Sequence, residues 1–144
     1  MMDEKNILLV EDNPDDEHLA VRALKKHNVV NDIVVARDGQ QALDYLLDEN
    51  NPLPAMVLLD LKLPKVGGLE VLQKLRATAR TALLPVVILT TSKEEQDLID
   101  SYRSGCNSFI RKPVDFIQFA EAMRQLKVYW LVINEGPPKN RRPS

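Results

Sequence analysis

Carboxylate side chains follow two short apolar stretches of the chain. Glu11 and Asp12 come directly after residues 7–10, and Asp60 comes directly after residues 56–59. Three carboxylates that lie close together repel one another at neutral pH, so they are stable mainly when a cation lies between them. Oxygen ligands of this kind suit Mg²⁺ or Mn²⁺. If the fold brings the two stretches together, we expect a divalent metal site at Asp60.

Two further stretches end in side chains that donate hydrogen bonds. Thr90 follows residues 85–89, and Lys112 follows residues 108–111. A hydroxyl, an ammonium and a metal around Asp60 would surround a tetrahedral anion and neutralise the charge of a transferring phosphoryl group. Each of these groups alone also has an ordinary structural use as a helix cap, a loop cap or half of an ion pair.

The stretches that position these residues alternate between strand and helix patterns. Continuous apolar runs indicate strands that are buried on both faces, and they occur at residues 7–10, 33–36, 56–59 and 85–89, with a short fifth strand expected at residues 108–111. Runs with helical period lie between or after them, at residues 14–27, 42–47, 69–78, 94–104 and 115–126. This alternation predicts a single α/β domain, in which helices cover both faces of a parallel sheet.

We expect the flavodoxin-like, doubly wound order 2-1-3-4-5 for this five-stranded sheet. In that order the first, third, fourth and fifth strands are neighbours, and ligands bind outside the carboxyl ends of such strands. The pattern therefore predicts that the residues at those strand ends converge on one pocket: Glu11, Asp12, Asp60, Thr90 and Lys112.

Two of the expected helices carry apolar residues at helical spacing. In the helix at residues 14–27, Leu19 and Leu24 belong to a stripe that we expect to face the core. In the helix at residues 94–104, Leu98, Ile99 and Tyr102 share one face.

Composition excludes several classes of function. The chain has 144 residues, with 44% hydrophobic and 28% charged residues, as globular domains do. A net charge of -2 gives no general reason to bind nucleic acid or an anionic membrane, although Lys139, Arg141 and Arg142 form a basic cluster that is either a solvated tail or a phosphate contact. The single cysteine, Cys106, excludes an intrachain disulfide. Without a signal peptide or apolar span, the cytoplasm is the expected location.

The motifs at the strand ends resemble a known family. Glu11-Asp12, Asp60 with Pro64 and Gly68, Thr90, and Lys112-Pro113 are similar to the signature of the receiver domain of two-component response regulators, over about residues 6–126. The resemblance implies that Asp60 accepts a phosphoryl group from a sensor histidine kinase. It implies a phosphoacceptor in a phosphorelay, with at most slow autophosphorylation and autodephosphorylation, instead of an enzyme.

The same resemblance implies roles for the other site residues. Glu11 and Asp12 would hold Mg²⁺, or Mn²⁺, together with Asp60 and the main-chain carbonyl of Lys62. Thr90 and Lys112 would contact the phosphoryl oxygens, Phe109 would be the aromatic residue that changes rotamer, and the Lys112-Pro113 bond would be cis.

Shorter strings resemble stand-alone response regulators that are paired with phytochrome-type kinases, which implies a role in light signalling. These strings are residues 10–13, 36–39, 89–92 and 129–130. Three positions depart from the wider family, of which Gly67, in a place where Asp is common, should not affect catalysis. Glu11 replaces the commoner Asp and reaches one methylene further, which favours a shifted or water-mediated contact with the metal. Phe109 replaces Tyr and lacks its hydroxyl, so any switch works by burial of the ring.

Three other functions compete with phosphoacceptance. A hydrolase of the aspartyl-phosphate type usually has a second Asp two residues after the nucleophile, where this chain has Lys62. A flavin or nucleotide site needs a Gly-rich or Ser/Thr-rich loop after the first strand, whereas residues 11–16 are mostly acidic. The remaining alternative is a receiver-like domain that acts as a protein-interaction module without phosphorylation.

We expect residues 1–134 to form one receiver domain with an extended last helix, and residues 135–144 to form a flexible tail with prolines and arginines. Residues 128–133 are apolar on every side, so Tyr129, Leu131 and Val132 would face outward from that helix. An exposed apolar patch usually marks a partner surface, and two-fold dimers are the commonest assemblies. The sequence therefore predicts a homodimer; the alternatives are that the extension folds back on its own domain or contacts only the kinase.

Overall fold

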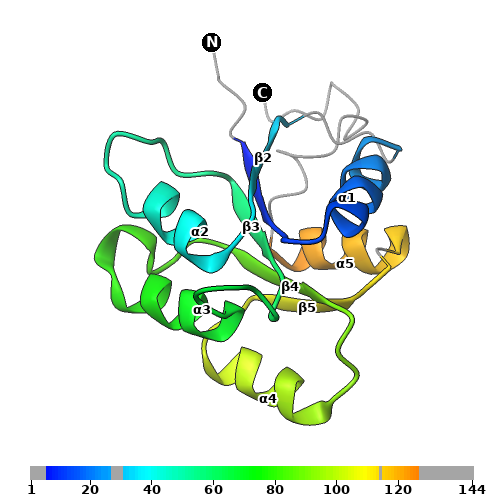
Figure 1. The fold of residues 1–144 in the computed structure, drawn as a ribbon. Coiled ribbons are helices and arrows are strands. Elements are labelled where there is room, and N and C mark those ends of the chain that lie inside the picture. Colours follow the sequence, from blue (N-terminus) through cyan, green and yellow to red (C-terminus); the bar gives the residue numbers. More distant parts are fainter. Residues whose placement is uncertain (1–5, 27–30, 114, 127–144) are drawn as a thin grey trace, which may run out of the picture.

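The computed structural model describes residues 6–26, 31–113 and 115–126 (Figure 1). The strands are β1 (Ile7–Val10), β2 (Ile33–Ala36), β3 (Met56–Leu59), β4 (Val86–Thr90) and β5 (Ser108–Arg111). The helices are α1 (Pro14–Lys26), α2 (Gly39–Leu46), α3 (Gly68–Ala77), α4 (Glu95–Arg103) and α5 (Phe116–Leu126), with one 3-10 turn, η1 (Ala79–Thr81), before β4.

The five strands form one parallel sheet in the order β2-β1-β3-β4-β5. The predicted fold class and strand order are therefore confirmed. Each parallel connection crosses over through a helix, and Figure 1 shows α1 and α5 on one side of the sheet with α2 and α3 on the other. This arrangement places the carboxyl ends of β1, β3, β4 and β5 along the same edge of the sheet.

Both faces of the central strands β1, β3 and β4 are buried, which explains why these strands are almost entirely apolar. In β1, Leu8 and Val10 pack into the core cluster that includes α2 and α3, while Ile7 and Leu9 pack into the cluster that includes α1 and α5. Successive side chains of a strand point to opposite faces, so each face of β1 receives two apolar residues. Burial of such a side chain contributes about 1.5–3 kcal/mol, and both core layers depend on these strands.

In α1 and α4, fewer of the large apolar side chains are buried than the sequence predicts. Leu24 is buried, but Leu19 is 56% exposed, so the prediction that Leu19 faces the core is wrong. Ala20 and Leu24 are one turn apart and turn the contact face away from Leu19. In α4 the small Ser101 is the buried residue, and Ile99 and Tyr102 lie at the margin, 39% and 50% exposed.

Two helix ends lie where Asp38 and Gly105 predict a break between elements. Asp38 caps α2, because its side chain accepts a hydrogen bond from the backbone N–H of Gln41 at 2.8 Å. Gly105 follows α4 with a φ of 103°, a left-handed conformation that glycine adopts without strain. Within the described ranges, no helix combines the length and apolar character that crossing a membrane requires.

Candidate functional site

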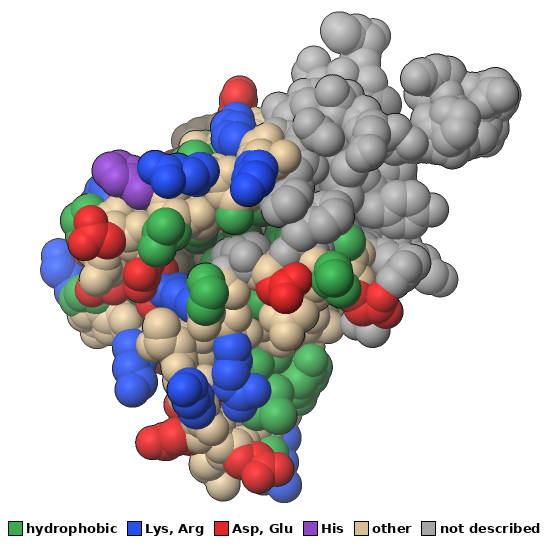
Figure 2. Space-filling view, turned by 90° about the vertical axis from the view of Figure 1, so that its right-hand side faces the viewer, with side chains coloured by type: hydrophobic (Ala, Val, Ile, Leu, Met, Phe, Trp, Pro, Cys, Tyr) green, Lys and Arg blue, Asp and Glu red, His purple; other side chains and the backbone are tan. Residues whose placement is uncertain are grey.

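The residues predicted to converge lie at the carboxyl edge of the sheet. Glu11 and Asp12 follow β1, Asp60 follows β3, Thr90 ends β4, and Lys112 follows β5. Since β1 and β4 both pair with β3, Asp60 is central among these strand ends. In Figure 2, which turns the right-hand side of Figure 1 toward the viewer, acidic and basic side chains are interspersed, with hydrophobic side chains between them.

Three carboxylates at this edge lie close enough to share a cation. Glu11, Asp12 and Asp60 each offer one oxygen, and these oxygens all lie within 4.8 Å of one another. Ladder hydrogen bonds fix the backbone beside them: the N–H of Glu11 donates to the carbonyl of Ala36 at 2.9 Å, and the N–H of Asp60 donates to that of Val10 at 3.2 Å. Glu11 and Asp60 are buried, whereas Asp12 is exposed and forms the open side of the cluster.

The Lys112 ammonium lies among these carboxylates. It donates hydrogen bonds to Glu11, to Asp16 Oδ2 at 3.0 Å and to Asp60 Oδ2 at 3.2 Å. Burial alone would lower the pKa of Lys112, but the hydrogen bonds to Glu11 and Asp16 and the charges of Asp60 and Glu11 outweigh it, and the pKa lies above its ordinary value. Lys112 is therefore positively charged at neutral pH and partly neutralises the cluster.

The cluster remains negatively charged beside this lysine. Burial raises the pKa of Glu11, the nearby charge of Asp60 raises it further, and the hydrogen bond from Lys112 only partly opposes both. Three carboxylates and one ammonium leave an excess of negative charge that a divalent cation would neutralise. The donor set therefore fits Mg²⁺ or Mn²⁺.

Thr90 lies deep at the end of β4, only 1% exposed. Its hydroxyl oxygen accepts a hydrogen bond from the N–H of Ser92 at 3.2 Å, and the Ser92 hydroxyl donates to Asp97 Oδ2 of α4 at 2.6 Å. The guanidinium of Arg111 donates to the carbonyl of Ser92 at 2.9 Å. Thr90 is thus connected to α4 and β5 through Ser92.

Phe109 is half-buried in β5 and packs against the core cluster that includes α2 and α3. The guanidinium carbon of Arg111 lies 5.6 Å from the centre of the Phe109 ring, within the range of a cation–π contact. Phe109 is neighboured in the sheet by Ile88, two residues before Thr90. The ring is therefore near the site without forming part of its polar lining.

Some site features were absent from the sequence-based prediction. Asp16 lies in the acidic first turn of α1 and contacts Lys112, a partner that its position at a helix N-terminus does not predict. The N–H of Lys62 donates to Asp60 Oδ1 at 3.4 Å, a contact that does not involve the carbonyl implied by the family resemblance. The Lys112-Pro113 bond is cis, which confirms that prediction.

Gly68 allows the backbone after β3 to fold closely against Asp60. A Cβ at residue 68 would lie 2.2 Å from the carbonyl oxygen of Asp60, whereas a Cβ at residue 67 would meet nothing nearer than 3.8 Å. We predict that Gly68→Ala shifts Asp60 and lowers the free energy of unfolding by about 1–3 kcal/mol. Chemical denaturation measures this change. Gly67→Ala is the matched control and should unfold close to the unmodified chain; an equal loss in both variants would contradict the steric argument.

The chain belongs to the family of response regulator receiver domains, whose family model matches residues 7–124. Receiver domains are phosphoacceptors. Among curated relatives, the probable methanogenesis regulatory protein FilR2 of Methanothrix harundinacea (strain 6Ac) is 44% identical over 134 residues, which cover 91% of this chain and 86% of that protein.

Solved structures of the same family are similar over most of their length. The bacteriophytochrome response regulator AtBRR is 52% identical, with a TM-score of 0.82 and coverage of 92% of this chain and 99% of that one. The Mn²⁺-bound form of response regulator Rcp1 is 36% identical, with a TM-score of 0.72 and coverage of 88% and 94%. The phosphorylated cyanobacterial phytochrome response regulator RcpA is 34% identical, with a TM-score of 0.75 and coverage of 94% and 98%.

Proposed function

We propose that Asp60 accepts a phosphoryl group from the phosphohistidine of a sensor kinase. The observation that carries this proposal is the placement of the Lys112 ammonium between the buried carboxylates of Asp60 and Glu11. A structural ion pair needs one carboxylate for one lysine, whereas this site holds more carboxylates than Lys112 can pair. The additional carboxylates can bind a metal, and one of them can accept a phosphoryl group.

In the proposed reaction, a carboxylate oxygen of Asp60 attacks phosphorus as the bond from phosphorus to the kinase histidine nitrogen breaks. The Lys112 ammonium and the Thr90 hydroxyl donate hydrogen bonds to the phosphoryl oxygens and stabilise the charge that they carry. Glu11, Asp12 and Asp60, with the Lys62 carbonyl, would hold Mg²⁺, which neutralises charge between the carboxylates and the phosphoryl group. We assign no further catalytic turnover to the chain.

We infer that the kinase is of the phytochrome type and that the pathway responds to light. The similarity to the bacteriophytochrome response regulator AtBRR and to the phosphorylated regulator RcpA supports this inference. The test is phosphotransfer from an autophosphorylated phytochrome-type kinase, compared with a kinase of another sensor class at equal concentration. Faster transfer from the second kinase would contradict the pathway, and absence of transfer from both would favour an interaction module without phosphorylation.

Asp12 gives the metal proposal a specific test. We predict that Asp12→Ala lowers the affinity for Mg²⁺ at least tenfold, because an exposed carboxylate that joins Glu11 and Asp60 is lost from the open side of the cluster. Titration of amide chemical shifts with Mg²⁺ measures the affinity. Asp15→Ala removes an exposed acid of the first turn of α1, three residues from Asp12, and should bind Mg²⁺ as the unmodified chain does. Equal affinities in the two variants would contradict the assigned ligand set.

Phosphorylation would be converted into a surface change through Thr90 and Phe109. We infer that Thr90 shifts toward the phosphoryl group and that the half-buried Phe109 ring moves into the space it leaves. The aromatic resonances of Phe109 should therefore change when a phosphate mimic binds; resonances that ignore the mimic would contradict this role.

We also propose a homodimer in which Tyr129, Leu131 and Val132 contribute to the interface. These three residues lie outside the described part of the chain, so the proposal depends on their apolar sequence. Light scattering on the purified chain measures its mass in solution, and Leu131→Arg should dissociate the dimer without unfolding the domain. A monomer at about 10–100 μM, where dimers of ordinary affinity persist, would contradict the proposal.

A further inference from the structure

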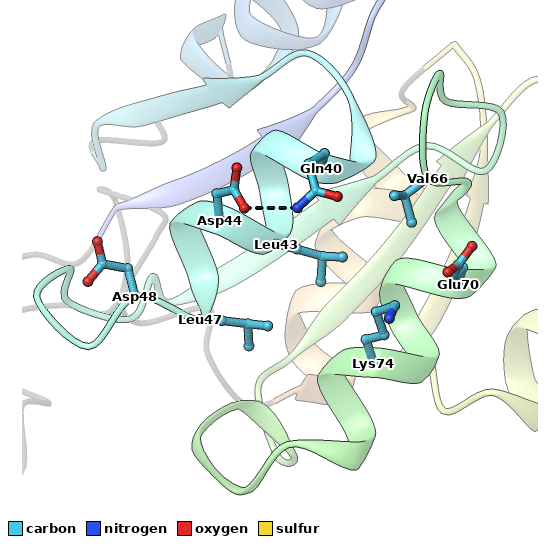
Figure 3. A pocket seen from close by; sticks show the side chains of 8 residues that line it. All are labelled: Gln40, Leu43, Asp44, Leu47, Asp48, Val66, Glu70 and Lys74. Carbon is cyan, nitrogen blue, oxygen red and sulfur yellow. Dashed lines mark hydrogen bonds between the residues drawn. The ribbon is translucent and has the colours of Figure 1, made fainter.

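A groove of about 460 Å³ lies between α2 and α3 (Figure 3), and its lining includes none of the predicted site residues at the strand ends. Leu43 and Leu47 of the α2 side and Val66 of the loop before α3 give it apolar walls. Leu47 is 37% exposed, although it is a large aliphatic side chain. Figure 3 shows these three side chains directed into the space between the two helices.

The rim of this groove is acidic. Asp44, Asp48 and Glu70 line it, with Lys74 as the one cationic residue among the lining side chains. Asp44 accepts a hydrogen bond from the neutral Gln40 amide at 2.9 Å, and Asp48 accepts one from the backbone N–H of Asn50 at 2.9 Å. Among the residues that the structure describes, none of the three carboxylates forms an ion pair.

Arg80, which contacts the loop after α2, does not form an ion pair with this rim. Arg80 donates its hydrogen bonds to the backbone carbonyls of Leu46, Asp48 and Asn51. The guanidinium therefore stabilises the loop after α2 and does not pair with a carboxylate. An apolar groove with unpaired acids on its rim fits a short segment that is basic and partly apolar.

The chain itself contains such a segment. Residues 137–142 read Pro-Pro-Lys-Asn-Arg-Arg, which combines three cations with two prolines. We propose that this basic segment binds in the groove between α2 and α3 of its own chain, with Lys139, Arg141 and Arg142 facing the acidic rim. The proposal does not depend on phosphorylation of Asp60.

Topology allows the segment to reach the groove. Every helix of a parallel sheet of this kind returns the chain to the amino edge of the sheet, so α2 and α5 end at the same edge. The layers that contain these two helices are separated by about 20 Å, twice the usual layer spacing of roughly 10 Å. Residues 127–138 span up to about 40 Å if they are extended, so the proposal requires that the last helix does not continue to residue 134, the end expected from the sequence. This length is enough to pass from α5 around the amino edge to the Asp48 end of the groove.

The expected affinity is too weak for the segment of a second copy to occupy the groove, but it is sufficient for the segment of the same chain. Exposed ion pairs are individually weak, so a free segment with three charges would bind at concentrations on the order of 1 mM. Attachment to the same chain supplies an effective concentration in the same millimolar range. At micromolar protein concentration, only the tethered segment would occupy the groove appreciably.

The test places a nitroxide spin label beside the basic segment in the full chain. The label is attached to Ser144→Cys, with the buried Cys106 replaced by Ala, and the broadening of backbone amide signals is recorded. We expect signals of Leu47, Asp48 and Lys74 to lose at least half their intensity relative to the reduced label, and signals of Arg22 in α1 to keep theirs. High salt should reverse the effect, since exposed charges are screened.

Charge-reversal variants and a mixed sample decide the outcome. Asp48→Lys should abolish the broadening, whereas Glu49→Lys, the adjacent residue that does not line the groove, should preserve it. Glu70→Lys serves in place of Asp48→Lys if the latter does not fold. Absence of broadening, or broadening that survives both rim variants, would overturn the proposal. So would broadening found in a mixture of isotope-labelled chains and separate spin-labelled chains, because it would assign the segment to a second copy.

Discussion

Replacement of Asp60 by Asn is expected to abolish phosphorylation completely while the domain stays folded. The amide has nearly the shape of the carboxylate but no negative oxygen to attack phosphorus, so no acyl phosphate can form. The substitution also removes one negative charge beside Glu11. Burial raises the pKa of Glu11, and the charge of Asp60 raises it further, which shows that the two carboxylates repel each other. We therefore expect the unfolding midpoint of Asp60→Asn to equal or exceed that of the unmodified chain.

Intact-protein mass after incubation with a small-molecule phosphodonor and Mg²⁺ measures the first part of this prediction. Asp44→Asn is the control, because Asp44 is a carboxylate outside the site and its loss should leave phosphorylation unchanged. A phosphate on Asp60→Asn would show that another residue accepts it. An unfolded Asp60→Asn would show instead that the Asp60 carboxylate is needed for stability, contrary to the repulsion argument.

Removal of the Lys112 ammonium is expected to have the largest effect on stability. Its side chain is only 10% exposed and pairs with Glu11, Asp16 and Asp60. Lys112→Met keeps most of the aliphatic stem but leaves buried carboxylates without their cation, and breaking a buried pair in this way costs about 3–5 kcal/mol. In a metal chelator we expect a loss of roughly 3 kcal/mol in the free energy of unfolding. Millimolar Mg²⁺ should recover part of it, because the metal compensates the same charges.

Lys65→Met is the matched control for this variant. The Lys65 ammonium is 3.8 Å from Asp38, but its side chain is 70% exposed, and such a surface pair contributes at most about 1 kcal/mol. Urea denaturation with and without Mg²⁺ compares the two variants. A Lys112→Met chain as stable as Lys65→Met in the chelator would contradict the electrostatic role, and a loss that Mg²⁺ does not reduce would contradict the shared site.

The fold was predictable because four of the five strands are almost entirely apolar runs and a distinct polar or charged residue marks the carboxyl end of each of the strands that form the site. Leu59 followed by Asp60, and Val10 followed by Glu11, mark both a buried strand and the edge at which it ends. The order of the strands followed from the alternation of strand and helix, since right-handed crossovers leave few arrangements. The same information placed Lys112 beside Asp60, although the two residues are 52 positions apart.

The contacts that the sequence did not predict depend on the exact orientation of helices. Leu19 belongs to an apolar stripe yet is exposed, because packing through Ala20 rotates α1 about its axis. Asp16 reaches Lys112 for the same reason, and no spacing rule separates a capping acid from an acid that pairs across elements. The link from Thr90 through Ser92 to Asp97 depends on the path of the loop before α4, which residue types alone do not determine.

Chemical location of the phosphoryl group tests the central claim most directly. Borohydride reduces an aspartyl phosphate to homoserine and releases phosphate, so digestion and mass spectrometry identify the residue that carried the group. After incubation of the chain with a phosphodonor and Mg²⁺, we predict homoserine at residue 60 alone, and no homoserine when a chelator replaces Mg²⁺. Homoserine at another aspartate, or none in a chain whose intact mass shows one phosphate, would contradict the assignment of Asp60 as the phosphoacceptor.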